Sequence, residues 1–481
     1  MRLRSFVPLR APRLPLLLVF SFLVGCGELL HQQAPPQAEM PPSLQVSPSP
    51  QVPVTIERPV LPLPGGLDTT PVLNSNSPEI IQREGILVST LPPRAGADGQ
   101  AFLDYAFEGK FSYFSHHIAK DETPGERLLY VGLIATSLSE QPRTISPTRG
   151  SSYLSQPDAP FSPLDPIVPN PLGAVYAGPG DRVATELLLG KSNLPLEPFR
   201  LEPRESKLLY QWSIPTNVTT LPPVNGRTVL ADFESNGPVY LSEVAIFAKR
   251  SETGEFLVPQ LVDYETLIRQ GQLAGEREAA ATPFDPGQPP PKGAFTFGRV
   301  AGVSLGSHWL GDALSTEEES TLLSQPGSGV GYPLATTFLN RLGTGQVQSA
   351  PMVRRYPETA YQAHGNYGVT YRLRLPLSNP EVLPRRYALS LSHPVTATGR
   401  TVTYLEPPKS PVTFRGTIRL DWKDERGMDV TRLTHVTLQL GQRLPPFEVI
   451  EVPPQSRRVV ILQLIYPADA SPPQLLTIVR E

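Results

Sequence analysis

The sequence predicts an all-β protein, and three observations carry that prediction. From about Gly66 onward, short runs of β-branched, aromatic and leucine residues are broken by Pro, Gly or Asn about every eight to fifteen positions. Proline contributes 58 of 481 residues, about 12% against a usual ~5%, which argues against long helices. Helix signals are few and short. This texture is typical of two β-sandwich-like, immunoglobulin-like lobes.

The predicted strands share a high content of β-branched and aromatic residues between turn residues. They are residues 85–90, 127–135, 207–214, 228–233, 239–248, 367–375, 387–392, 412–422, 435–440 and 458–466. Short helices are expected at 181–189 and 262–270, which end at Gly190 and Gly271. Ser315 with Glu318 forms a capping box that opens a third helix toward Leu323.

The chain begins like a secretory signal peptide. Arg2, Arg4, Arg10 and Arg13 precede an apolar run over 14–24, with no acidic residue among them. An apolar stretch of about eleven residues is too short for a transmembrane helix, which needs roughly twenty. We therefore expect export from the cytoplasm, with removal of residues 1–25.

Leu23-Val24-Gly25-Cys26 resembles the lipobox of bacterial lipoproteins, in which small residues precede a cysteine. The resemblance implies lipidation of the Cys26 sulfur and cleavage before it, and two or three acyl chains anchor a protein stably. Cys26 is the only cysteine, so no internal disulfide explains it. The alternative is ordinary cleavage with an incidental Cys26.

Composition divides the mature chain into a tether and two lobes. Residues after Cys26 are rich in Pro, Gln and Ser and lack the aromatic residues of a core, which predicts a disordered, polyproline-like tether. At about 3.1 Å per residue such a tether spans on the order of 100 Å. The expected parts are a signal peptide (1–25), the lipid-anchored tether (26–64), a first β-rich lobe (65–281), a linker (282–294) and a second β-rich lobe (295–481).

The charge balance argues against nucleic acid as a partner. The chain has 42 basic and 45 acidic residues, and removal of the four signal-peptide arginines changes the net charge from −3 to −7. The glycine-rich run 327–331 lacks the pattern of a phosphate-binding loop, so no nucleotide or other cofactor is expected.

Catalytic and metal-binding patterns are weak. Gly302-Val303-Ser304-Leu305-Gly306 matches the nucleophile-elbow pattern, but no clear helix follows, and a glycine-rich turn is the simpler interpretation. His116 and His117 would point to opposite faces of a strand, so no metal site is expected. Asp421, Asp424, Glu425 and Asp429 do not match a calcium loop and fit a solvated hairpin turn at Gly427.

One segment is dense in ligand-capable side chains. Tyrosine rings beside Arg and Asn donors could bind a sugar or a peptide, whereas the same tyrosines also suit an ordinary strand. A binding module should expose the rings, and a scaffold should bury them. The candidate ligand-binding residues are Arg354, Arg355, Tyr356, Tyr361, His364, Asn366 and Tyr367, with Gln362 and Tyr371 nearby.

Four strings together resemble a cyanobacterial family of exported proteins known only as a domain of unknown function, number 3370. They are residues 73–79 (LNSNSPE), 152–161 (SYLSQPDAPF), 340–351 (NRLGTGQVQSAP) and 361–368 (YQAHGNYG). The resemblance covers the chain from about Pro59 to the C-terminus. It implies a cyanobacterial source and a periplasmic or outer-envelope location, and it implies no activity, cofactor or catalytic residue.

We therefore expect a non-catalytic envelope lipoprotein that is held to a membrane through Cys26. Its body would be a structural or binding module for a cell-wall or extracellular glycan, or for another envelope protein. The alternative is a hydrolase of envelope polymers, built on Ser304 with a histidine or on Asp421 with a second carboxylate about 5 to 10 Å away. Gly27 after the cysteine favours the outer membrane over the inner one, because inner-membrane retention in some bacteria requires Asp there.

Overall fold

The computed structural model describes residues 50–93, 99–285, 288 and 291–481. Within these residues 27 strands and three α-helices occur, and the strands form four sheets. The all-β prediction is confirmed. The predicted signal peptide and Cys26 lie outside the described residues, as do most residues of the predicted tether.

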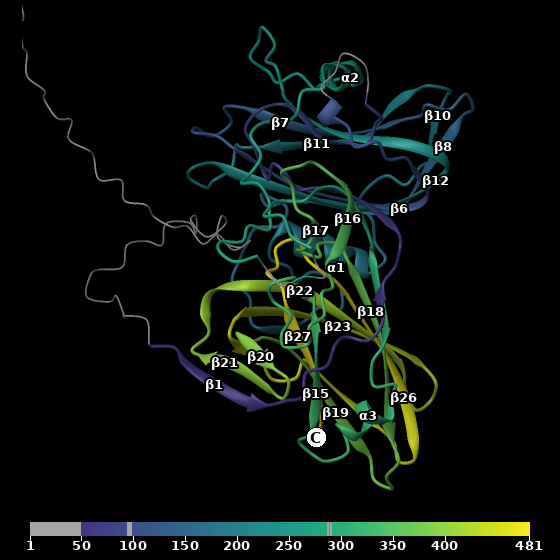
Figure 1. The fold of residues 1–481 in the computed structure, drawn as a ribbon, viewed down its shortest axis with the longest axis vertical. Coiled ribbons are helices and arrows are strands. Elements are labelled where there is room, and N and C mark those ends of the chain that lie inside the picture. Colours follow the sequence, from purple (N-terminus) through teal and green to yellow (C-terminus); the bar gives the residue numbers. More distant parts are fainter. Residues whose placement is uncertain (1–49, 94–98, 286–287, 289–290) are drawn as a thin grey trace, which may run out of the picture.

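The first sandwich is built from a twelve-stranded sheet that folds over a buried aromatic core (Figure 1, upper half). Phe107, Phe111, Tyr113, Trp212 and Phe233 pack together in this core. Its strands are β3 (Pro71–Ser75), β4 (Ile80–Ile81), β5 (Gly85–Ser89), β6 (Phe107–Lys120), β7 (Leu128–Thr136), β8 (Arg143–Leu154), β10 (Phe199–Leu201), β11 (Ser206–Pro215), β12 (Val224–Phe247), β13 (Ala301–Leu305), β16 (Ala350–Arg355) and β17 (Gln362–Ala363).

Strand β12 belongs to both layers of the first sandwich. Its first half pairs with β6 and β8, and its second half pairs with β5 and β7. The change of partners falls between Ser235 and Val239, where the register shifts. The sequence predicted two strands here, because Asn236-Gly237-Pro238 reads as a turn. In the structure this segment is a bulge within one strand of 24 residues.

The second sandwich packs a seven-stranded sheet against a five-stranded sheet over a core that includes Tyr332, Tyr371, Phe414 and Tyr466. The seven strands are β2 (Gly66–Leu67), β9 (Ile167–Pro169), β14 (His308–Asp312), β18 (Thr370–Asn379), β22 (Lys409–Lys423), β23 (Asp429–Leu440) and β26 (Ser456–Ile465). The five strands are β15 (Gly329–Leu334), β19 (Arg385–His393), β24 (Gln442–Arg443), β25 (Glu448–Val452) and β27 (Gln474–Arg480).

The two sandwiches exchange strands in both directions. β2 and β9 precede residue 282 in the chain, yet they pair with β14 and β23 of the second sandwich. β13 and β16 follow residue 294, yet β13 pairs with β3 of the first sandwich and β16 pairs with β13. The domain bounds at 282–294 stay a prediction. The observed strand pairing joins the two sandwiches through their sheets.

The ordered body begins inside the range predicted as tether. β1 (Val52–Glu57) pairs along its whole length with β21 (Thr401–Glu406), and β20 (Thr396–Thr398) completes a three-stranded sheet. Leu63 is buried, and the indole N–H of Trp309 donates to the backbone oxygen of Pro64 at 3.0 Å. Composition did not reveal this, because an edge strand needs few apolar residues when its partner strand completes the hydrogen bonds.

Three helices accompany the strands, close to the predicted positions. α1 (Pro179–Leu188) lies between the sandwiches, and α2 (Leu261–Gln270) ends at Gly271, whose φ of 67° is left-handed as expected of a C-cap. α3 (Glu317–Thr321) begins one residue later than predicted, with its capping box formed by Thr316 and Glu319. In the part of the chain that the structure describes, no helix has the length and apolarity needed to span a membrane.

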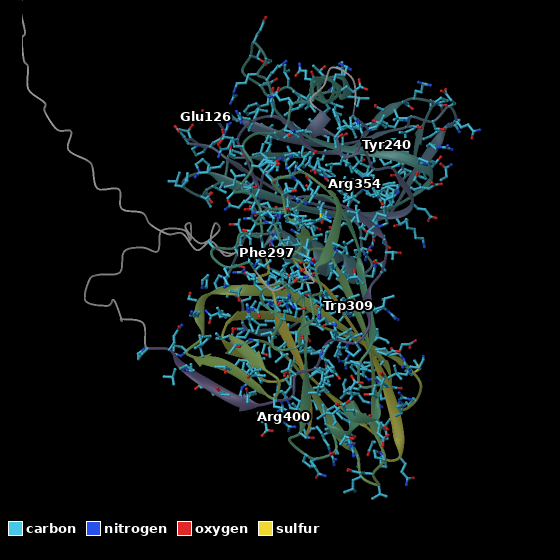
Figure 2. The ribbon with its side chains drawn as sticks, viewed as in Figure 1. Glu126, Tyr240, Phe297, Trp309, Arg354 and Arg400 are labelled. Atoms are coloured by element: carbon cyan, nitrogen blue, oxygen red, sulfur yellow. The ribbon has the colours of Figure 1, made fainter. Side chains whose placement is uncertain are left out.

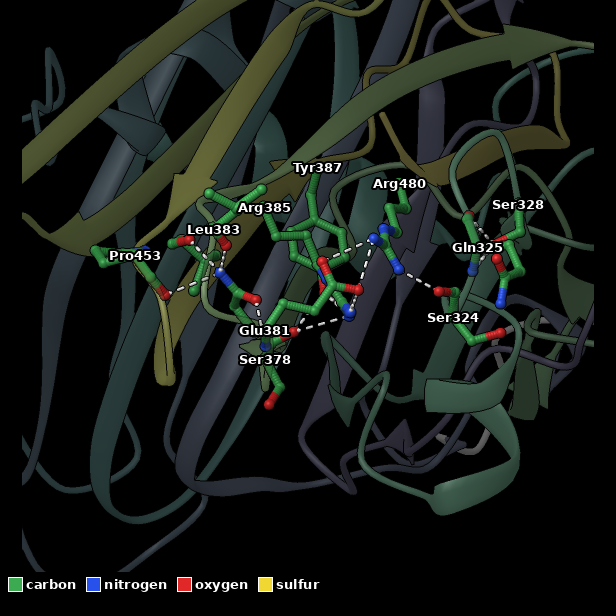
Figure 3. Close-up of polar contacts among 12 residues, drawn as sticks. Ser324, Gln325, Ser328, Ser378, Glu381, Leu383, Arg385, Tyr387, Pro453 and Arg480 are labelled. Atoms are coloured by element: carbon green, nitrogen blue, oxygen red, sulfur yellow. Dashed lines mark hydrogen bonds and ion pairs between the residues drawn. The ribbon is translucent and has the colours of Figure 1, made fainter.

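The C-terminal strand is fastened by a pair of buried arginines (Figure 3). Arg480 of β27 donates from Nη2 to both carboxylate oxygens of Glu381, at 2.7 and 2.9 Å. Arg385 of β19 donates to the same carboxylate at 2.8 Å and also contacts the hydroxyl of Tyr387. Charge-assisted contacts of this kind are stronger than neutral hydrogen bonds, so they hold the end of the chain to the β18–β19 turn.

Candidate functional site

The candidate binding residues follow β16 and β17 along the junction between the sandwiches, and Figure 2 labels Arg354 and Phe297 near the middle of the molecule. These residues differ in solvent exposure. Tyr356, His364 and Asn366 are buried, and Arg354 is exposed. Arg355, Tyr361 and Tyr367 are half-buried. The seven side chains therefore do not share one exposed face.

Tyr356 has a structural position in the first sandwich. Its hydroxyl donates to the backbone oxygen of Ala101 at 3.1 Å and accepts from the backbone N–H of Ser89 at 3.0 Å. The guanidinium of Arg277 lies 4.3 Å from its ring centroid. Burial raises the pKa of Tyr356 to about 12. The phenol is thus a satisfied core group, away from any solvent-facing ligand.

Arg355 and Tyr361 are the members of the set that do come together at the surface. The Arg355 guanidinium lies 3.6 Å from the Tyr361 ring centroid, and Tyr361 meets Phe284 edge-on at 5.5 Å. Phe295 also packs against Phe284, and Phe297 stacks on His364. The predicted linker 282–294 therefore contributes one aromatic residue, Phe284, to the junction, and Phe295 and Phe297 follow directly after it.

Tyr367 lines a narrow crevice between the sandwiches. The cavity volume is about 30 Å³, enough for one or two water molecules. Besides two tyrosines, its polar lining residues are Asn74, Ser112, Arg149, Asp232, Ser304 and Ser307. Asp232 is already paired there, because its carboxylate accepts from Ser112 Oγ at 2.6 Å and from Arg149.

Ser304 is not positioned as a nucleophile elbow. It is buried within strand β13, and its hydroxyl accepts a hydrogen bond from the Asn74 amide at 2.9 Å. A nucleophile elbow instead places the serine on a turn between a strand and a helix. The surroundings of Ser304 are those of a structural side chain.

Asp421 is engaged by neighbouring donors. Arg419 and Thr431 donate to it at 2.8 and 2.6 Å, and Gln463 at 3.1 Å. Burial alone would raise the pKa of Asp421, but these hydrogen bonds outweigh it and hold the pKa below its usual value. Gly427 has a left-handed φ of 77° in the β22–β23 hairpin, as predicted.

A Ser, His and Asp cluster occurs where the sequence analysis named no site. Ser307 Oγ lies 2.8 Å from His308 Nδ1, and Asp68 Oδ2 lies 3.5 Å from the same nitrogen. A proton relay needs the serine and the carboxylate on opposite ring nitrogens. Here both face Nδ1, so the cluster does not form a catalytic triad. The separation of Asp68 from Ser307 along the chain hid it from motif reading.

Asp68 anchors its own loop instead. Its Oδ1 accepts from the backbone N–H groups of Ser307 and His308, and its Oδ2 accepts from Thr70 Oγ1 at 2.6 Å. Burial acts to raise the pKa of Asp68, but the hydrogen bonds from His308, Thr70 and Ser307 bring it well below the usual value.

The histidines face separate partners. His116 Nδ1 lies 2.8 Å from Thr228 Oγ1, and His117 Nε2 lies 3.0 Å from Ser75 Oγ. Across residues 50–93, 99–285, 288 and 291–481, no three His, Cys, Asp or Glu side chains group closely enough to hold a metal ion.

Helix α1 makes polar contacts with both sandwiches. Toward the second sandwich, Asp181 contacts His435, and Thr185 Oγ1 lies 2.8 Å from Thr417 Oγ1. The carboxylate of Asp469 accepts from the backbone N–H groups of Gly180 and Asp181 at 3.1 and 3.2 Å. Toward the first sandwich, Glu186 accepts from Ser151 and Tyr153 at 2.5 and 2.7 Å. These contacts join residues that are far apart in the sequence, so no local sequence pattern predicted them.

Distant structural matches include procruciferin, an 11S globulin from Brassica napus, with 10% identity, a TM-score of 0.09, and coverage of 78% of this chain and 83% of that one. An 11S globulin from Wrightia tinctoria has 10% identity, a TM-score of 0.10 and 83% coverage of each chain. Matches this distant carry no argument about fold or function.

A search of curated proteins finds no match. The family model described as "Protein of unknown function (DUF3370)" matches residues 58–480, which is nearly the whole described body. The chain therefore belongs to the DUF3370 family.

Proposed function

We propose that this protein is a non-catalytic lipoprotein of the cell envelope whose body is a structural or binding module. Its partner would be a cell-wall or extracellular glycan, or another envelope protein. The observation that carries the proposal is the exchange of strands between the sandwiches, in which β2 and β9 enter one and β13 and β16 enter the other. Such a body suits a fixed spacer or platform better than a hinged enzyme.

The side chains at the junction support the same proposal. Tyr356, His364 and Asn366 are buried, and Ser304 and Asp421 are engaged by neighbouring side chains. An enzyme needs several polar groups converging on one accessible position. The crevice at the junction has room for one or two water molecules, which is too little for a polymer chain.

The proposed location rests on the N-terminal residues. Arg-rich and apolar stretches precede Leu23-Val24-Gly25-Cys26, and the family resemblance suggests a cyanobacterial envelope. Acylation of Cys26 would hold the mature chain to a membrane, with Gly27 favouring the outer one. The residues between Cys26 and β1 would let the body stand away from the lipid surface.

Intact mass and membrane fractionation test the anchor, with Cys26→Ala as the comparison. We expect the wild-type chain to begin at Cys26, to carry acyl mass and to sediment with membranes, and we expect Cys26→Ala to lose all three. A soluble, unacylated wild-type chain would overturn the anchor.

A second experiment tests the body. The full mature Cys26→Ala chain is incubated with purified wall material from its own cells, and both bound protein and released soluble sugar are measured. Binding without release is expected. Release of soluble fragments above a heat-treated control would overturn the non-catalytic proposal and favour a hydrolase.

A further inference from the structure

A polar cavity of about 290 Å³ lies beside α1, separate from the junction crevice. Tyr176, Arg182, Glu186 and Lys191 supply its polar groups, and Gly173 and Leu189 lie beside them. The Gly173 backbone has a φ of 72°, and a Cβ there would lie 2.3 Å from Leu189 Cδ1. The left-handed φ is the reason that glycine suits this position of the loop.

Arg182 is held in place by two aromatic rings. Its guanidinium carbon lies 3.9 Å from the Tyr153 ring centroid and 4.5 Å from that of Tyr176. Among the described residues its hydrogen bonding uses Nη1, which donates to the backbone oxygen of Asp158. The Nε and Nη2 donors are left for another partner. Stacking fixes the planar group in advance, so a ligand would lose little side-chain entropy on binding it.

The charges that line this cavity favour an anion. Lys191 is exposed, and its ammonium makes one long contact of 3.3 Å with the backbone oxygen of Leu172. Glu186 is the acid among the lining residues, and its two oxygens already accept from Ser151 and Tyr153. Arg182 and Lys191 against Glu186 give a net charge of +1 (two positive charges minus one negative).

We propose that this cavity binds the carboxylate of an acidic sugar unit within an envelope glycan. The inference rests on the proposed function and names its ligand class. A guanidinium with two free donors matches the two oxygens of a carboxylate, and Lys191 adds a second charge-assisted contact. The volume lies just below the usual range for small-ligand sites, about 300–1,000 Å³, and suits one sugar ring with the rest of the chain outside.

The experiment measures binding to the full mature Cys26→Ala chain by isothermal titration calorimetry at low salt. The probes are a galacturonic acid trisaccharide, the matched neutral galactose trisaccharide and inorganic phosphate. We expect the acidic trisaccharide to bind and the neutral one to bind at least about tenfold more weakly, because the neutral sugar cannot make the charge-assisted contacts with Arg182 and Lys191.

Three variants locate the site. Lys191→Gln keeps the fold, because the side chain is exposed, and should weaken binding of the acidic trisaccharide by about tenfold. Arg182→Lys keeps the charge but loses the stacked fork, and should weaken it by a similar or larger factor. Lys423→Gln, in the β22–β23 hairpin of the second sandwich, is the matched charge control and should bind like the parent chain.

Three outcomes would overturn the proposal. These are equal binding of the neutral and acidic probes, unchanged binding by Lys191→Gln, and binding of phosphate without the acidic sugar. If the acidic trisaccharide does not bind while the chain still binds whole wall material, the cavity assignment fails and the proposed function stands. If neither binds, the wall-binding form of the proposed function fails as well.

Discussion

His435 Nε2 lies 2.8 Å from Asp181 Oδ2, and both side chains are fully buried. The pair joins β23 of the second sandwich to the first turn of α1. Asp181 also accepts from the backbone N–H of Ala177 at 2.8 Å. The junction between the sandwiches is thus stabilised by a buried polar contact, where loss of either partner is costly.

Replacement of His435 by Ala should lower the free energy of unfolding by about 1–3 kcal/mol, because it removes a buried hydrogen-bond partner of Asp181. Urea denaturation followed by circular dichroism measures the change. The control is Lys423→Gln, which breaks an ion pair of the same 2.8 Å length with Asp429, but at side-chain exposures of 67% and 85%. That change should cost less than about 1 kcal/mol. Equal effects of the two variants would contradict the structural account.

Asp469→Asn should remove a pH dependence of stability. Burial raises the pKa of Asp469 to about 7, above its value of about 3.9 in an unfolded chain. Because the folded state keeps this proton longer than the unfolded chain does, the free energy of unfolding of the wild type should fall by about 1.4 kcal/mol for each unit that the pH rises between about pH 4 and 7. Above pH 7 this contribution should no longer change. The charged groups that face the Asp469 carboxylate are Asp181, which also raises its pKa, and Arg415, which lowers it. Unfolding measured at pH 5, 6, 7 and 8 should show the variant gaining on wild type as pH rises; parallel profiles would refute the assignment.

Tyr356→Phe tests whether this residue is structural. Loss of the hydroxyl leaves Ser89 N–H and Ala101 C=O without their partner, which should cost about 1–2 kcal/mol of stability. Binding to wall material should not change. Tyr240→Phe is the control, because the Tyr240 hydroxyl has no hydrogen bond to the described residues. A binding defect in a stable Tyr356→Phe protein would restore this tyrosine as a ligand contact.

Glu381→Gln should loosen the C-terminal strand, since Arg385 and Arg480 would lose the carboxylate between them (Figure 3). We expect a melting temperature lower by about 2 °C at pH 7. The hydrogen bond from Arg385 lowers the pKa of Glu381, so this stabilisation is present above the unfolded-state pKa of about 4.3 and is lost as pH falls through the folded value. Differential scanning calorimetry at pH 7 and pH 3.5 should show the difference shrink.

The matched control for that variant is Glu57→Gln. Glu57 pairs with Arg400 at 3.0 Å, but both side chains are about 70% exposed. Its melting temperature should stay close to that of the wild type. A larger effect at Glu57 than at Glu381 would show that the edge of β1, rather than the arginine pair, limits stability.

Local signals in the sequence were enough for most of the regular elements. The strands β5, β7 and β11 lie within one or two residues of their predicted bounds, because each is an apolar run between turn residues. Gly271 marked the end of α2, since a left-handed C-cap favours glycine. Strand β12 was missed as one strand, because its bulge carries turn-forming residues.

What the sequence could not reveal is the pairing between distant segments. β2 has two residues and β9 has three, too few for any periodicity, and they exist because β14 and β23 offer open edges. The candidate site shows the same limit. Composition identified the Arg354–Tyr367 set, but in the structure some of these side chains are buried and others exposed. The cavity around Arg182 is formed by α1 and a loop that carries no sequence motif.

The exchange of strands also dictates the order in which the chain can fold. β3 ends at Ser75 and receives β13 at Ala301, a separation of 226 residues (301 − 75), so the first sandwich cannot complete its sheet until more than half of the chain has been made. Contacts this distant in sequence slow folding, because a long loop must close first. Neither sandwich can therefore mature as an independent unit during synthesis. Strand β3 must therefore keep one edge open until β13 has been made.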